Sequence, residues 1–117
     1  MIYTLYRIIA RADPTVLDFR SHMAQCQSRR FAEIQDHALW AGVSTFLNPL
    51  RAAARARRFS ALGTHLARLE LPDDDPGVVV RQTLDPRSAH FTVWACEDLL
   101  LTFVREVTAI SAGSVVE

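Results

Sequence analysis

Three groups of side chains in this sequence could do chemistry: an arginine-rich segment, an aspartate turn and four histidines. Arg51, Arg55 and Arg58 stand at positions i, i+4 and i+7, so on a helix they share one face. Such a stripe could neutralise the phosphates of a nucleotide or a nucleic acid. The alternative is a solvated helix face, or a pairing of the arginines with the acidic turn Asp73–Asp75, within one chain or between chains.

The histidines and aspartates do not indicate a metal site. Three consecutive aspartates lack the alternate spacing of a calcium loop, so Asp73–Asp75 is interpreted as a turn without an ion. No two histidines stand four residues apart on one convincing helix, and no metal is expected. His90 differs from the others because it begins a predicted strand directly after a turn, where active-site side chains often emerge. Its alternative is a surface histidine at a strand end.

Several common enzyme classes are excluded by missing motifs. The sequence has no Gly-x-Ser-x-Gly nucleophile elbow, no phosphate-binding loop and no dinucleotide fingerprint. This argues against the common hydrolases, the P-loop enzymes and the doubly wound dehydrogenases.

The composition is that of one ordinary globular domain. The chain has 117 residues, 50% of them apolar, and a formal net charge of zero. The N-terminus is too quickly charged for a signal peptide and no run is long enough for a membrane helix, so a cytoplasmic location is expected. Cys26 and Cys96 are expected to be inert buried thiols, with a single disulfide as the alternative.

Hydrophobic periodicity and turn residues predict the elements that must position these groups. A helix is predicted to start at Asp13-Pro14 and to end before Ser28, and a second, firmer one to follow the Asn48-Pro49 cap through Arg58. Residues 29–41 fit either a helix or a structured loop. Strands are predicted at residues 2–9, 43–47, 65–71, 78–84, 90–94 and 103–110, with one helical turn at 97–100.

Helices come early in this order and strands come late, which favours an α+β fold rather than a regular parallel α/β fold. We expect a single domain over residues 1–110, with a sheet of about five strands and two or three helices. Residues 111–117 have the small-residue composition of a flexible C-terminal tail.

A family resemblance is carried by two short motifs and the element order. Tyr6-Arg7 on the first strand, Gly42-Val43-Ser44-Thr45-Phe46 on the second, and the following helix rich in alanine and arginine resemble small bacterial ADP-ribosyltransferase-fold proteins. The most similar types are the compact toxin-like members and the rifamycin-modifying members. The resemblance covers roughly residues 3–110 and implies a mixed or antiparallel split sheet.

The resemblance implies NAD as the substrate and assigns roles to individual residues. Arg7 would hold a phosphate or ribose, because a guanidinium suits bidentate phosphate contact. Ser44 and Thr45 would line the nicotinamide pocket, and Phe46 or Trp94 would stack on a ring of the nucleotide, with Trp40 as a further stacking candidate.

The chain departs from the family at the catalytic acid. Many members place a glutamate on a later strand, where it stabilises the ribosyl cation. Glu97, which begins a turn, and His90 are the candidates for this catalytic position, and Glu70 lies in a strand that exposes one face.

Two functions from different classes therefore stand at this point. The first is an NAD-binding ADP-ribosyltransferase-like protein that transfers ADP-ribose or hydrolyses NAD, with a cleft bordered by Arg7, Ser44 and His90. The second is a non-catalytic module for protein–protein interaction or homodimer formation, suggested by the apolar run Val78–Val80. Neither nucleic acid nor a membrane is expected as a partner.

Overall fold

The first strand, β1 (Ile2–Ile9), lies inside the sheet and pairs along its whole length with β3 (His65–Pro72). The computed structural model describes residues 2–19, 42–83 and 89–110, and the structural statements below concern these residues. The other strands are β2 (Val43–Phe46), β4 (Val79–Gln82), β5 (His90–Trp94) and β6 (Val104–Ala109). All six form one antiparallel sheet in the order β4-β5-β2-β1-β3-β6. The predicted α+β class is confirmed, with six strands rather than about five.

Two α-helices accompany this sheet in the described part of the chain. They are α3 (Pro49–Arg58) and α4 (Glu97–Thr102), and two short 3-10 turns, η1 (Val16–Phe19) and η2 (Ser60–Leu62), lie beside them. The helix predicted to start at Asp13-Pro14 is seen only as η1, and the rest of it lies outside the described residues, as do residues 29–41 and the predicted tail 111–117. No helix in the described ranges is both long enough and apolar enough to cross a membrane.

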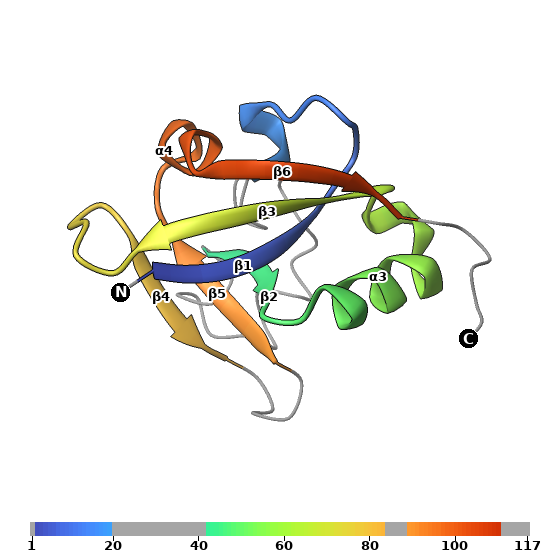
Figure 1. Cartoon of the computed structure of the whole chain (residues 1–117), viewed down its shortest axis with the longest axis horizontal. Helices are drawn as coiled ribbons and strands as arrows, with labels where there is room; N and C mark the ends of the chain where they lie inside the picture. Colours follow the sequence, from blue (N-terminus) through green and yellow to red (C-terminus); the bar gives the residue numbers. More distant parts are fainter. Residues whose placement is uncertain (1, 20–41, 84–88, 111–117) are drawn as a thin grey trace, which may run out of the picture.

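The sheet is divided between β1 and β2. These two strands share a single residue pair, Tyr6 with Phe46, whereas β1 and β3 share eight pairs. Figure 1 shows β1, β3 and β6 running across the view while β2, β4 and β5 cross it steeply. One rung of pairing permits such a change of strand direction, because few backbone hydrogen bonds must stay aligned across the junction. The sheet therefore consists of two half-sheets, β4-β5-β2 and β1-β3-β6.

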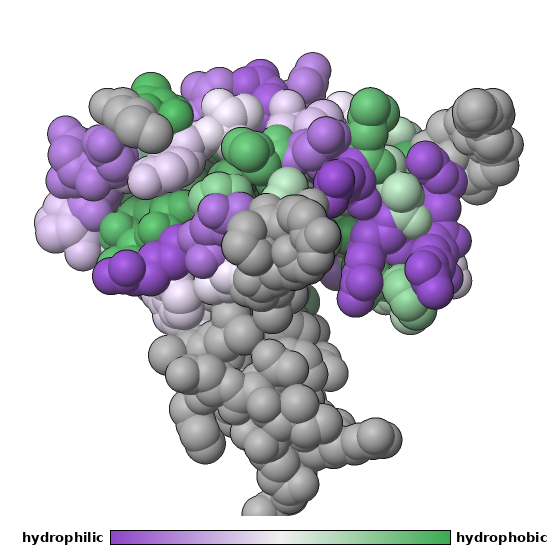
Figure 2. All heavy atoms as spheres, turned by 90° about the horizontal axis from the view of Figure 1, so that it is seen from below, coloured by the Kyte–Doolittle hydropathy of each residue, from purple (hydrophilic) through white to green (hydrophobic). Residues whose placement is uncertain are grey.

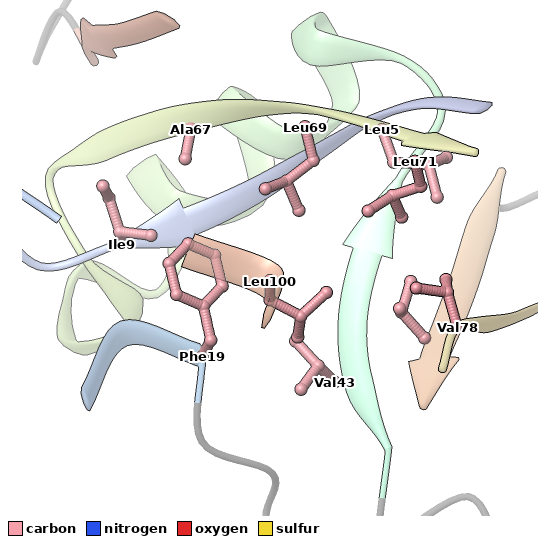
Figure 3. Packing of buried hydrophobic residues seen from close by; sticks show 10 residues of the cluster. Leu5, Ile9, Phe19, Val43, Ala67, Leu69, Leu71, Val78 and Leu100 are labelled. Atoms are coloured by element: carbon pink, nitrogen blue, oxygen red, sulfur yellow. The ribbon is translucent and has the colours of Figure 1, made fainter. Parts of the chain in front are cut away.

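Alternation along the strands produces two faces with different coverings. We call the first the α4 face: it carries Leu5 and Ile9 of β1 and is packed by Phe19 of η1 and Leu100 of α4. Figure 3 shows these side chains converging with those of β2 and β3 in the main core. The second, the α3 face, carries Ile8 and Leu66, which pack against Ala52 and Ala56 of α3.

Helix α3 forms where the sequence predicts it, between the same residues. Asn48 adopts an extended conformation, and its side-chain oxygen accepts hydrogen bonds from the backbone N–H groups of Leu50 (2.8 Å) and Arg51 (3.4 Å). Pro49 occupies the first helical position, where its missing N–H costs nothing. The small alanine side chains on the inner side let the helix approach the sheet closely, so its arginines are turned to solvent.

The first prediction concerns the main core. Leu69 is completely buried in β3, so Leu69→Ala should lower the free energy of unfolding by about 2–5 kcal/mol, through lost burial and a residual cavity. Leu50→Ala is the matched control, because Leu50 is 76% exposed and its loss should change stability by less than about 0.5 kcal/mol. Urea unfolding monitored by circular dichroism measures both. Equal losses in the two variants would contradict the described core.

Candidate functional site

Arg7 joins the two half-sheets at the place where their pairing fails. Its Nε donates to the backbone carbonyl of Asp18 in η1 at 3.0 Å, and its Nη1 donates to the backbone carbonyl of Ser44 in β2 at 2.9 Å. A guanidinium carries five N–H donors, and Nη2 makes no hydrogen bond within the described ranges. Donor capacity therefore remains at the junction after both carbonyl contacts are made.

The charge of Arg7 is only partly compensated. Burial lowers the pKa of Arg7 from 12.5 to about 10, and the nearby Asp18 carboxylate opposes this by raising it. With this pKa the guanidinium stays protonated at neutral pH. Over the whole residue, Arg7 is half-buried. Within the described residues no carboxylate lies within ion-pair distance of it. A desolvated cation whose partners are carbonyls is a chemical match for an anionic group.

The Asp18 carboxylate is held elsewhere. One of its oxygens accepts from the Ala10 N–H at 3.2 Å and the other from the Thr15 N–H at 2.8 Å. The second oxygen also lies 3.8 Å from Nε of Arg11. The Asp18 side chain therefore connects the turn after β1 with η1. These bonds hold in place the Asp18 carbonyl, which accepts the hydrogen bond from Arg7.

The residues Ser44 and Thr45, predicted to line one pocket, point to opposite faces. Tyr6 pairs with Phe46, and both side chains lie on the α3 face. Because side chains alternate along a strand, Arg7 (after Tyr6) and Thr45 (before Phe46) both lie on the α4 face. Thr45 is completely buried, and its hydroxyl donates to the Phe91 carbonyl at 2.9 Å. Ser44 contributes its carbonyl to Arg7, while its side chain lies on the α3 face opposite Thr92.

His90 lies on the α3 face, in register with Phe46. The two rings meet edge to face, with centroids 5.4 Å apart. Nδ1 of His90 is 2.8 Å from the Thr83 hydroxyl, which is in turn 2.7 Å from the Thr92 hydroxyl. The expected cleft bordered by Arg7, Ser44 and His90 side chains does not fit this arrangement, because strand alternation separates Arg7 from the other two. The catalytic role predicted for His90 stays a prediction.

Trp94 belongs to the same face as His90, four residues along β5. It packs beside Gly42, where a Cβ would come within 3.1 Å of the indole and 2.2 Å of Cγ2 of Thr92. Position 42 therefore has no room for a side chain, because Trp94 and Thr92 pack directly against its backbone. Of the predicted ring-stacking residues, Phe46 and Trp94 lie on the α3 face, away from the Arg7 guanidinium, and Trp40 is outside the described residues.

Glu97 starts α4, which lies on the α4 face. This helix packs against η1, the turn whose Asp18 carbonyl receives Arg7. Glu97 is partly buried, whereas its neighbour Asp98 is exposed. The predicted residues thus form two groups: Arg7, Thr45 and Glu97 belong to the α4 face, and Ser44, Phe46, His90 and Trp94 to the α3 face.

Two contributors at the junction were missed by the sequence reasoning. The Asp18 carbonyl positions Arg7, and no pattern distinguishes a backbone acceptor in a turn. Phe91 is opposite Thr45, so it is the aromatic residue of β5 on the Arg7 side of the sheet. The face on which Phe91 lies can be derived from the alternation of side chains once β5 is known to pair with β2. A single sequence does not show which strands pair.

No group of three or more His, Cys, Asp or Glu side chains is arranged to hold a metal ion in the described ranges. Comparisons with protein-family models, with curated proteins and with solved structures return no match to this chain.

The second prediction concerns the hydroxyl network on the α3 face. Thr83→Val removes the partner shared by His90 and Thr92, both of them buried, and should lower the free energy of unfolding by about 1–3 kcal/mol. Thr108→Val, at an exposed position of β6, should leave stability within about 0.5 kcal/mol of the wild type. Urea unfolding of both variants provides the comparison. Stability of Thr83→Val equal to the wild type would show that the network contributes nothing.

Proposed function

We propose that this chain is an NAD-binding, ADP-ribosyltransferase-like protein whose nucleotide binds at the junction of the two half-sheets. The observation that carries the proposal is the Arg7 guanidinium, a desolvated cation that reaches across the junction and has N–H donors that no described residue accepts. A pyrophosphate provides the anionic oxygens that such a fork binds through paired N–H···O contacts. The divided sheet, expected from the family resemblance, supports the same placement.

The proposed site lies on the α4 face rather than across both faces. Arg7 would hold the pyrophosphate, and Phe91 is the aromatic residue on this side that could pack against a ring of the nucleotide. Thr45 would shape the floor of the site without bonding to the ligand, because its hydroxyl already donates to the Phe91 carbonyl. Ser44 would act through its carbonyl, which orients the guanidinium.

The proposed reaction is cleavage of the bond between nicotinamide and ribose. The glycosidic C1′–N bond breaks, nicotinamide leaves as the neutral base, and water or an acceptor hydroxyl adds to C1′ with loss of one proton to solvent. The ribosyl centre carries positive charge in the transition state, so a carboxylate nearby lowers the barrier. Glu97 is our candidate for that carboxylate, because α4 covers the same face as Arg7.

The third prediction tests NAD binding. At a tenfold excess over its dissociation constant, NAD should stabilise the folded chain by about 1.4 kcal/mol and raise the melting temperature by a few degrees. Arg7→Gln should abolish this shift, because the neutral amide does not attract the pyrophosphate. Arg81→Gln removes an exposed arginine from β4 and should keep the shift. Differential scanning fluorimetry with circular dichroism as a folding check measures all three proteins.

A wild-type protein with no NAD-dependent shift and no nicotinamide release would overturn the proposal. An equal shift in wild type and Arg7→Gln would instead remove Arg7 from the site.

The fourth prediction separates chemistry from binding. Glu97→Gln should reduce nicotinamide release at least about tenfold while keeping the NAD-dependent thermal shift, because it removes the negative charge and preserves the shape. Asp98→Asn alters the adjacent exposed carboxylate and should retain the wild-type rate. Release is measured by chromatography of the reaction mixture. If both variants match the wild type, Glu97 is not the catalytic carboxylate.

A further inference from the structure

One end of the molecule is basic and also exposes apolar side chains. We call it the basic end, and it is formed by α3 and the residues that flank it. Its exposed arginines are Arg51, Arg55, Arg57 and Arg58, and its exposed large apolar residues are Leu47, Leu50, Phe59 and Leu62. α3 contains no acidic residue. A surface that combines such charge with exposed apolar groups is typical of an interaction site.

Three of the four arginines of this end make no ion pair with a carboxylate of the described residues. Arg55, Arg57 and Arg58 form no ion pair with a carboxylate in the part of the chain that the structure describes. Two of them instead lie over the ring of Phe59, with guanidinium carbons 4.8 Å (Arg55) and 5.4 Å (Arg58) from its centroid. Stacking on an aromatic ring holds a guanidinium in place while leaving its N–H donors available.

The other end of the molecule has the opposite charge. We call it the acidic end, and it comprises the turn Asp73–Asp75 between β3 and β4, with Ile2 and Val79 beside it. Ile2 pairs with Pro72, the last residue before the turn, and Val79 begins the strand after it. Both Ile2 and Val79 are exposed large apolar residues. Like the basic end, this end therefore combines charged groups with exposed apolar side chains, but its charged groups are carboxylates.

The two ends cannot meet within one chain. Figure 1 places the β3–β4 turn and α3 at opposite sides of the fold, and Figure 2 shows hydrophilic residues at both of these sides with hydrophobic residues between them. In the described residues the exposed arginines of α3 and the aspartates of the β3–β4 turn therefore lie on opposite sides of the fold. Two copies bring these ends together when they are arranged head to tail.

We propose that the basic end of one molecule docks onto the acidic end of a second copy of this chain. This contact is heterologous, because different surfaces of the two copies meet, so each complex retains one unoccupied basic end and one unoccupied acidic end. Association then continues beyond two copies as the concentration rises. The proposal is independent of NAD binding, since it involves neither Arg7 nor Glu97.

The physical chemistry sets the expected strength and salt dependence. Individual ion pairs at a surface are weak, so the contact also requires burial of Leu50 and Phe59 against the apolar residues of the acidic end. Raising NaCl from about 0.1 M to about 1 M shortens the screening length from about 10 Å to about 3 Å. The dissociation constant should therefore increase about tenfold or more.

The fifth prediction uses the full chain in sedimentation equilibrium. In low salt the weight-average mass should rise with concentration above the 13.1 kDa of one chain, without levelling off at two copies. Two variants each remove one end: Leu50→Ser with Arg58→Gln, and Ile2→Ser with Asp74→Asn. Each variant alone should be monomeric, with a melting temperature near that of the wild type because all four positions are exposed.

An equimolar mixture of the two variants is the decisive sample. One contributes an intact acidic end and the other an intact basic end, so the mixture should form a complex of two chains and no larger species. Asp13→Lys, which changes an exposed aspartate in the loop after β1, is the control and should associate like the wild type.

A mixture that stays monomeric overturns the head-to-tail contact, and so does a wild-type mass that levels off at two copies. A wild type that is monomeric at every concentration also overturns it. If that monomer binds a single-stranded oligonucleotide or anionic vesicles through its arginines, the partner of the basic end is an anionic polymer or surface and not a second copy of this chain.

Discussion

The junction between β1 and β2 is the constraint on which the rest of the structure depends. One rung of backbone pairing, Tyr6 with Phe46, cannot by itself hold two half-sheets together. The main core continues beneath both halves, with Val43 and Val93 from one and Leu5 and Leu69 from the other. Helix α3 adds contacts with β1, β2 and β3 on the opposite face. Arg7 completes the connection with one bond to β2 and one to η1, so a charged side chain stands where the sheet lacks backbone hydrogen bonds.

Much of the fold could be predicted from local signals, because local chemistry decides it. The Asn48 cap, the following proline and the alanine run specify α3, and its predicted range agrees with the structure. The predicted strands all occur, with ends that differ by a few residues, since turn residues and alternation mark each one. The order of strands in the sheet was not predictable in the same way. It depends on which apolar faces pack together across the two half-sheets, and neither hydrophobic period nor turn type contains that information.

The site was predicted less well than the fold, for a reason that specific residues illustrate. The family resemblance points to Arg7, and the structure places its side chain at the junction between β1 and β2. Ser44 and His90 were grouped with Arg7 although their side chains lie on the other face. The face on which each side chain lies depends on the pairing of Tyr6 with Phe46. This long-range contact determines which residues of β1 and β2 share a face. The Asp18 carbonyl could not have been identified at all, because every residue has a carbonyl and only the path of η1 brings this one to Arg7.

The hydrogen bonds of Arg7 to the Asp18 and Ser44 carbonyls do not by themselves require a charged side chain. A neutral donor of suitable length could bridge two carbonyl oxygens without the desolvation that lowers the pKa of Arg7 to about 10. Carbonyl dipoles offset only part of the cost of burying a cation, and the Asp18 carboxylate is occupied by two backbone N–H groups and Arg11. A guanidinium at this place is therefore costly as a pure cross-link, and an anionic ligand that completes its bonding would remove that cost. The same comparison distinguishes Arg7 from the arginines of α3, which remain exposed to water and carry no such penalty.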